Sequence, residues 1–310
     1  MRRRFRLEWL LALGGVIFLV IGLASGWDEI SESFDWTPGR FLIALAISFA
    51  GLTAVALSWA VLHSGPERAR AFRSYLLVQP AKHVPGGVAH PMSLISASSR
   101  EGSVAGSTTL FLRFSLLLVS GGMAHGLILL FAWDQTLLAV GAVIASIGAG
   151  AVAFSSRLAA RVEEWIPKVM KRFGKDDPSS DARRPVSAVQ TLGAWLWATL
   201  GIAGLAGGFA VLASSFQGMP SPVVLAGAFG VSWAVGYLLV PFPAGLGVRE
   251  TGLLLFLGST VGAGPVIAAS VLQRVCQMVA ELLGVLLGGV LGARERRLSR
   301  TTPDPVTPEP

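Results

Sequence analysis

The sequence predicts an all-α protein, a polytopic membrane helix bundle with about six full spans and two re-entrant helical hairpins related as an inverted repeat. Three observations lead to this fold class. Of the 310 residues, 53% are hydrophobic and only 14% are charged, whereas soluble domains carry about 25% charged residues. Several apolar runs exceed the roughly 18 residues of a membrane-spanning helix. Lysine and arginine also gather in segments that would share one side of the membrane.

Six apolar stretches are long enough to span a bilayer without a central break. They cover residues 7–24, 40–62, 107–132, 136–156, 187–213 and 265–291. The first follows a basic N-terminus and is predicted to be an uncleaved span, because its apolar run is long for a signal peptide.

The distribution of basic residues predicts the orientation of these spans. Four lie in the first six residues, five in 63–105, eight in 157–185 and four after 293, which together make 21 of the 25 lysines and arginines. Such asymmetry indicates the cytoplasmic side of the membrane. We therefore expect a multi-pass plasma-membrane protein with both termini in the cytoplasm. The net charge of +7 is explained by the basic residues on the predicted cytoplasmic side, so no nucleic-acid partner is expected.

Two further segments, 72–104 and 222–262, do not read as plain spans. Each contains Tyr-Leu-Leu-Val followed by proline, glycine and charge. We assume that each segment enters the membrane and leaves it on the same side. Because three full spans lie between the two segments, they would then enter from opposite sides of the membrane. This arrangement is typical of an inverted repeat. The alternatives are a chance match of four apolar letters and, for 222–262, an ordinary loop between two full spans.

The predicted organisation is a single membrane domain, 1–310, built from two halves. The first half covers 1–156 and contains the segment 72–104. A cytoplasmic interfacial loop, 157–186, leads to the second half. That half covers 187–292 and contains the segment 222–262, and a disordered cytoplasmic tail is predicted for 293–310.

The stretch PFPAGLGVRE, residues 241–250, carries the clearest candidate chemistry. Two prolines, the second of them Pro243, remove backbone donors, and Gly245 and Gly247 permit a turn that other residues resist. A helix starting near residue 248 would present free N–H groups, which suit an anion. Arg249 adds a planar guanidinium that fits phosphate or carboxylate. Glu250 would either orient this arginine or carry a proton. Together they predict a polar, anion-binding pocket at membrane depth.

Three more charged residues are candidates for the same site. Glu281 follows Arg274 by seven residues in the last apolar run, so both lie on one helical face. Ionisable groups inside a membrane are costly and usually functional. The alternative for these two is a structural ion pair that stabilises the bundle. Lys82 would bind an anion, or else belongs to a loop that follows the positive-inside rule.

The stretch PAGLGVRE resembles the Pro-Gly-Gly-Leu-Gly-Val-Arg-Glu signature of the lysylphosphatidylglycerol synthase transmembrane-domain family, also called flippase-like domain proteins. SYLLVQPAKHVPGGVAH resembles the family's companion motif, which assigns Lys82, Pro85 and Gly86 to the site. The family also has an arginine in the final span, here matched by Arg274. Ala244 departs from the signature, which has glycine there. The resemblance implies a stand-alone member without the aminoacyl-transferase domain.

What the resemblance implies is a lipid flippase that moves an anionic or amphipathic lipid between leaflets. The substrate would be an aminoacylated phospholipid or a lipid on a polyprenyl-phosphate carrier. Two alternatives remain: a non-transporting membrane partner of a lipid-modifying transferase, and a membrane-embedded head-group transferase. The sequence contains no phosphate-binding loop of the Gly-x-x-x-x-Gly-Lys type. Four histidines and one cysteine, all scattered, make no metal-ligand set. No cofactor, metal or enzymatic activity is expected.

Overall fold

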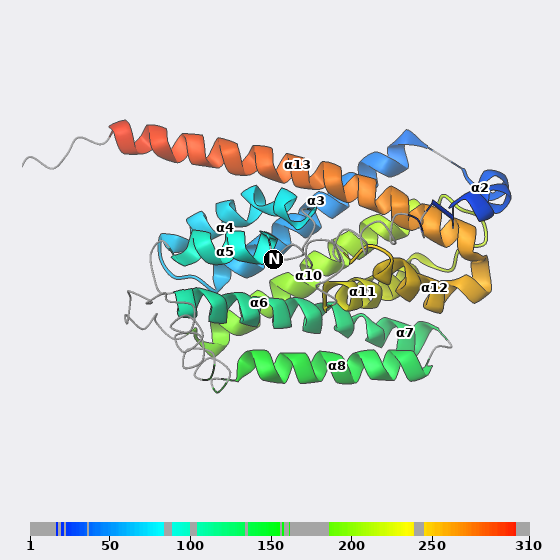
Figure 1. Cartoon of the computed structure of the whole chain (residues 1–310), viewed down its shortest axis with the longest axis horizontal. Coiled ribbons are helices and arrows are strands. Elements are labelled where there is room, and N and C mark those ends of the chain that lie inside the picture. Colours follow the sequence, from blue (N-terminus) through cyan, green and yellow to red (C-terminus); the bar gives the residue numbers. More distant parts are fainter. Residues whose placement is uncertain are drawn as a thin grey trace, which may run out of the picture.

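The computed structural model describes residues 17, 20–21, 23–35, 37–83, 89–99, 104–133, 136–155, 157, 161, 186–238 and 245–301. Within them the chain is helical and contains no β-strand, which confirms the all-α class (Figure 1). The helices are α2 (Trp27–Ser33), α3 (Pro38–Val61), α4 (Glu67–Leu77), η1 (Gln79–His83), α5 (Ala89–Ser99), α6 (Val104–Ala124), α7 (Gly126–Ala132), α8 (Thr136–Phe154), α10 (Ala188–Ala213), α11 (Pro222–Leu238), α12 (Val248–Val261) and α13 (Ala263–Thr301).

Five stretches of helix are long and apolar enough to cross a membrane, as a multi-pass membrane protein requires. They are Pro38–Val61, Gly106–Ala132, Thr136–Phe154, Ala188–Ala213 and Ala263–Arg297. They coincide with five of the six predicted spans. Most of the sixth, 7–24, lies outside the described residues, and so does almost all of the predicted loop 157–186. Large apolar side chains on α8, such as Ile144 and Ile147, are more than 60% exposed, as expected for a surface that faces lipid.

Helices α3 and α10 pack antiparallel against each other over most of their length. Ser58 donates to the carbonyl of Ala194 near one end of this pair (2.7 Å). A Cβ built on Gly204 would come within 2.6 Å of the Cα of Gly51, so the two backbones nearly touch. Small residues permit this approach, and dispersion between the two backbones drives it, because lipid supplies no hydrophobic force between helices.

Substituting Gly51 with valine should disrupt this crossing. The new Cβ would lie 2.7 Å from the carbonyl oxygen of Gly201 and 2.8 Å from the amide of Leu205, and neither backbone group can rotate away. Overpacking of this kind costs about 1–3 kcal/mol or more. Unfolding by sodium dodecyl sulfate in mixed micelles should therefore begin at a lower detergent fraction. Gly141→Val on α8 is the control, since no atom lies within 4 Å of its Cβ position. Equal unfolding of both variants would contradict the packing argument.

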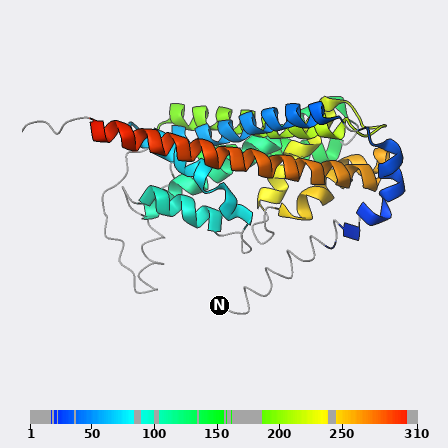
Figure 2. The ribbon, with the colours of Figure 1, turned by 90° about the horizontal axis from the view of Figure 1, so that it is seen from above.

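Helix α13 runs along the whole length of the bundle and extends past it at its C-terminal end (Figures 1 and 2). It continues to Thr301, so residues 293–301 are helical where the sequence predicted a disordered tail. The physical reason lies in α4, where Arg73 forms an ion pair with Glu295 and packs against Gly292. Residues 302–310 lie outside the described part of the chain.

The two segments that the sequence set apart each contain two short helices joined by a break. The first comprises α4, η1 and α5, and the second comprises α11 and α12. Figure 1 shows the first pair toward one end of the bundle and the second pair toward the other end. Both pairs contact α13. Neither contains a helix that meets the length of a full span.

Candidate functional site

The break before α12 is shaped by glycine. Gly245 and Gly247 have φ angles of +65° and +81°, a region that other residues rarely adopt. A Cβ on Gly245 would lie 3.2 Å from the Cα of Gly236, so the turn sits directly on α11. This close approach fixes where α12 begins. Arg249 and Glu250 consequently occupy its first turn, inside the bundle.

Glu250 is fully buried and accepts four hydrogen bonds. Its Oε1 accepts from the hydroxyl of Ser270 (2.8 Å) and from Nε of Arg274 (2.9 Å). Its Oε2 accepts from the backbone amide of Gly247 (2.9 Å) and from Nη2 of Arg274 (3.0 Å). The bond to Gly247 caps the start of α12, and the paired bonds to Arg274 form a bidentate fork. A carboxylate with this many donors is held in its ionised form and orients its neighbours, which favours the orienting role for Glu250.

Arg249 is also buried, but its own hydrogen bonding is incomplete. The side chain is 4% exposed, and its Nε lies 3.5 Å from Oε1 of Glu250. Nη1 makes a long bond to Gln277 (3.5 Å), and the guanidinium stands 5.2 Å from the ring centroid of Phe229. Nε and Nη2 have no hydrogen-bond partner among the described residues. Buried donors left in this state cost free energy, which a bound acceptor would recover.

This group carries an excess of positive charge. Two guanidinium groups, those of Arg249 and Arg274, face one carboxylate, that of Glu250. Arg274 is 16% exposed and also donates to the carbonyl of Gly245 (3.3 Å). One formal positive charge is therefore uncompensated within the group. The arrangement suits a phosphate or carboxylate.

A second charged group forms around Glu281. This carboxylate is 3% exposed and pairs with the ammonium of Lys82. Nε2 of His83 lies 2.8 Å from its Oε2. Lys82 also donates to the amide oxygen of Gln79 (3.3 Å). The break of the first segment is thereby fixed to α13.

Both charged groups lie on one face of α13. Arg274 and Glu281 are seven residues apart, or about 10 Å along the helix. One interpretation of the sequence was an ion pair between Arg274 and Glu281. The structure does not contain this pair, because each of the two side chains faces a different break. Glu250 binds Arg274 from the second segment, and Lys82 binds Glu281 from the first.

The two segments approach this face from opposite ends of α13. Along the first segment, Arg73 contacts Glu295, and about two turns further on Lys82 reaches Glu281. Along the second segment, α12 ends next to the start of α13 and begins near Arg274. Each break therefore points toward the middle of α13.

The tyrosines of the two Tyr-Leu-Leu-Val stretches both contact α6. Tyr75 packs edge-on against Phe114 of α6, with ring centroids 5.7 Å apart. Tyr237 bonds the hydroxyl of Ser115, the next residue on the same helix (3.0 Å). Both tyrosines end one arm of a broken segment and meet α6 at adjacent positions.

Most of the predicted site residues come together around α13, and some fall outside the described part. The residues brought together are Lys82, Gly245, Gly247, Arg249, Glu250, Arg274 and Glu281. Pro85, Gly86 and Pro243 lie outside the described residues. Ser270 was not predicted, although its position one turn before Arg274 puts it on the same face. Gln273 lies elsewhere, because it bonds Ser48 (3.3 Å) and the carbonyl of Leu205 (3.1 Å) between α3 and α10.

In the described residues, no three side chains from histidine, cysteine, aspartate and glutamate gather as a metal site would require. In the comparisons with known proteins, no family model matches the chain and no curated protein matches it. The geometry of the two charged groups is therefore the basis for any assignment of function.

Proposed function

We propose that this protein is a lipid translocase, which moves an amphipathic lipid with an anionic head group between the two leaflets of the membrane. The observation that carries the proposal is the buried guanidinium of Arg249, which lacks hydrogen-bond partners at two nitrogens in a group with excess positive charge. A phosphate or carboxylate would supply both the acceptors and the missing charge. Aminoacylated phospholipids and polyprenyl-linked glycolipids have such groups.

The depth of the site in the membrane is part of the proposal. A bilayer core is about 30 Å thick, and a helix rises about 1.5 Å per residue. Arg274 is eleven residues from the start of α13, hence about 16 Å along it. That distance supports a site near the midplane. The two broken segments would then be re-entrant hairpins that enter from opposite sides, as in transporters built from inverted repeats.

The proposed orientation follows the basic residues. With 21 of the 25 lysines and arginines on one side, both termini would be cytoplasmic. The first broken segment would enter from the cytoplasm and the second from the opposite side of the plasma membrane. A head group passing between the two breaks would meet Lys82 and Arg249 in turn, while its acyl chains stay in lipid. Rocking of one half against the other would expose each break alternately.

The resemblance to the flippase-like domain family supports the same function. It rests on the stretch that ends in Arg249 and Glu250, and these two residues lie in the buried charged group. Membership in that family is itself part of the proposal.

The experiment is a leaflet-exchange assay on the protein in liposomes. Fluorescent phosphatidylglycerol, aminoacylated phospholipid and polyprenyl-phosphate sugar are tested separately, and their outer-leaflet pool is quenched by dithionite. We expect the protein to accelerate exchange of at least one of them. Arg249→Met should slow that exchange by at least about tenfold, because a charge-assisted hydrogen bond contributes about 1.5–3 kcal/mol.

The same variant also separates function from folding. Glu250 keeps its bonds to Arg274, Ser270 and Gly247 when Arg249 is replaced. Replacing a poorly satisfied buried charge by an apolar side chain is neutral or stabilising, so Arg249→Met should unfold no earlier than the wild type. Arg294→Met, at an exposed position on α13, is the control and should exchange lipid normally. Normal exchange by a folded Arg249→Met protein would refute the role of Arg249, and no exchange of any lipid by wild type would favour a docking partner.

A further inference from the structure

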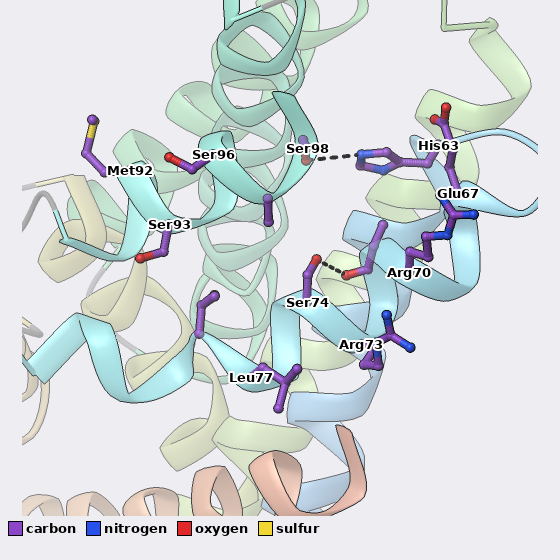
Figure 3. Close-up of a pocket in the computed structure, with 13 residues that line it drawn as sticks. His63, Glu67, Arg70, Arg73, Ser74, Leu77, Met92, Ser93, Ser96 and Ser98 are labelled. Atoms are coloured by element: carbon purple, nitrogen blue, oxygen red, sulfur yellow. Dashed lines mark hydrogen bonds between the residues drawn. The ribbon is translucent and has the colours of Figure 1, made fainter. Parts of the chain in front are cut away.

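A cleft of about 640 Å³ lies between α4 and α5 (Figure 3). Figure 3 shows the two helices antiparallel, with Glu67 and Ser98 at one end and Leu77 and Met92 at the other. None of its described lining residues belongs to the charged groups around Glu250 and Glu281. Its lining changes in character along its length, which gives it a direction.

The outer part of the cleft is polar and basic. Arg70 and Arg73 line it together with the hydroxyl-bearing Ser74, whereas Ser93 lies beside Met92 at the other end (Figure 3). Among the described lining residues, Arg70 and Arg73 supply the guanidinium groups and Glu67 the carboxylate. Arg73 is held by Glu295 of α13, but a guanidinium has five N–H donors and can serve a second acceptor. These groups suit a phosphate.

The inner part of the cleft is apolar and open. Leu77 and Met92 line it and are 42% and 59% exposed. Leu77 lies one helical turn beyond Arg73, about 6 Å further along α4. A phosphate at the arginines would thus leave room for an attached apolar chain at Leu77 and Met92. This polarity fits a lipid better than a free phosphate compound.

The inner end of the cleft also adjoins the charged group at Glu281. Val78 lines the cleft, and the next residue, Gln79, accepts a hydrogen bond from Lys82 (3.3 Å). Lys82 in turn pairs with Glu281 on α13. The apolar inner end of the cleft therefore lies next to the break of the first segment, where Lys82 is.

We infer that this cleft is a loading site, which holds the head group of one phosphate-bearing lipid before the lipid reaches Lys82. Arg70 and Arg73 bind the phosphate, and the acyl chain lies against Leu77 and Met92. The inference rests on the proposed function for the orientation of the cleft in the membrane. In the proposed topology, Arg70 and Arg73 would lie at the cytoplasmic surface. The head group of a cytoplasmic-leaflet lipid lies at that depth, with its chains deeper, as the lining requires.

A thiol placed in the cleft tests the inference locally. Ser93→Cys supplies the thiol, and Cys276→Ser removes the buried native one. The protein is held in nanodiscs of a neutral, phosphate-free galactolipid, with or without phosphatidylglycerol, and the rate of maleimide modification is measured. We expect phosphatidylglycerol to slow modification by about fivefold, since protection grows with occupancy of the site. No protection would overturn the inference.

Two charge variants define what binds the lipid. Arg70→Gln together with Arg73→Gln should abolish the protection. Arg294→Gln together with Arg297→Gln makes the same change in net charge on exposed positions of α13 and should keep it. Equal protection in both double variants would refute the role of the cleft arginines. Soluble glycerol phosphate should not protect, because it lacks an apolar chain. Equal protection by it would overturn the assignment to a lipid.

The ion pair between Arg73 and Glu295 supplies a further control. Arg73→Gln and Glu295→Gln both break this pair, but only the first removes a phosphate ligand. We expect Arg73→Gln to weaken protection and Glu295→Gln to keep or strengthen it. Equal loss of protection in both variants would mean that the ion pair only stabilises the structure and that Arg73 does not bind the phosphate. Because this assay measures occupancy and not exchange, lost protection with intact lipid exchange refutes the loading site alone. Intact protection without exchange refutes the proposed function.

Discussion

Replacing Glu250 by glutamine should be among the most destabilising single changes in this protein. The carboxylate accepts four hydrogen bonds and is the counter-charge for Arg249 and Arg274. Glutamine has similar volume but no charge, so the buried guanidinium of Arg249 and the partly buried one of Arg274 would both lose their counter-charge. Breaking a buried ion pair in this way costs about 3–5 kcal/mol. The free energy of unfolding, measured by dodecyl sulfate titration in mixed micelles, should fall by that amount.

A matched control for this change is Glu295→Gln, which breaks the ion pair with Arg73 on a side chain that is 54% exposed. Exposed pairs contribute less than about 1 kcal/mol, so this variant should unfold close to the wild type. Combining Glu250→Gln with Arg274→Met should restore part of the lost stability, because it removes one of the uncompensated charges. If Glu250→Gln is as stable as Glu295→Gln, the buried group does not hold the start of α12 as we argue.

Gly245→Ala should produce the second large effect, through the backbone. Gly245 has a φ of +65°, which costs an L-residue about 1–2 kcal/mol. Its Cβ would also lie 3.2 Å from the Cα and carbonyl oxygen of Gly236. Such overpacking adds about 1–3 kcal/mol. Because Arg274 donates to the carbonyl of Gly245, any movement of this turn would also displace the charged group.

Gly65→Ala separates the two causes. Gly65 has a φ of +55°, but nothing lies within 4 Å of its Cβ position. In Gly65→Ala the free energy of unfolding should therefore fall only by the cost of the backbone conformation, and the variant should exchange lipid normally. Gly245→Ala should lose more stability and slow exchange as well. Equal stability of the two variants would show that the contact with Gly236 contributes nothing.

Much of the helical framework could be predicted from the sequence, because it depends on local properties. Apolar length located five spans to within a few residues, since a bilayer sets the number of residues that a helix needs. Proline and glycine located the breaks that precede α12 and follow α4, because they act on their own backbone. The extension of α13 to Thr301 was missed, because its support is an ion pair with a residue more than two hundred positions away.

Tertiary structure alone decided which charges meet. The sequence identified Arg249, Glu250, Arg274 and Glu281 as unusual, since ionisable residues in apolar segments are costly wherever they lie. It could not assign their partners, because ion pairs form between side chains that packing brings close, whatever their separation along the chain. The sequence thus determined the helices, the breaks and the list of charged residues. The packing of two broken segments against opposite ends of α13 decided that these residues form two charged groups, one of which contains a guanidinium with two nitrogens that lack a hydrogen-bond partner among the described residues.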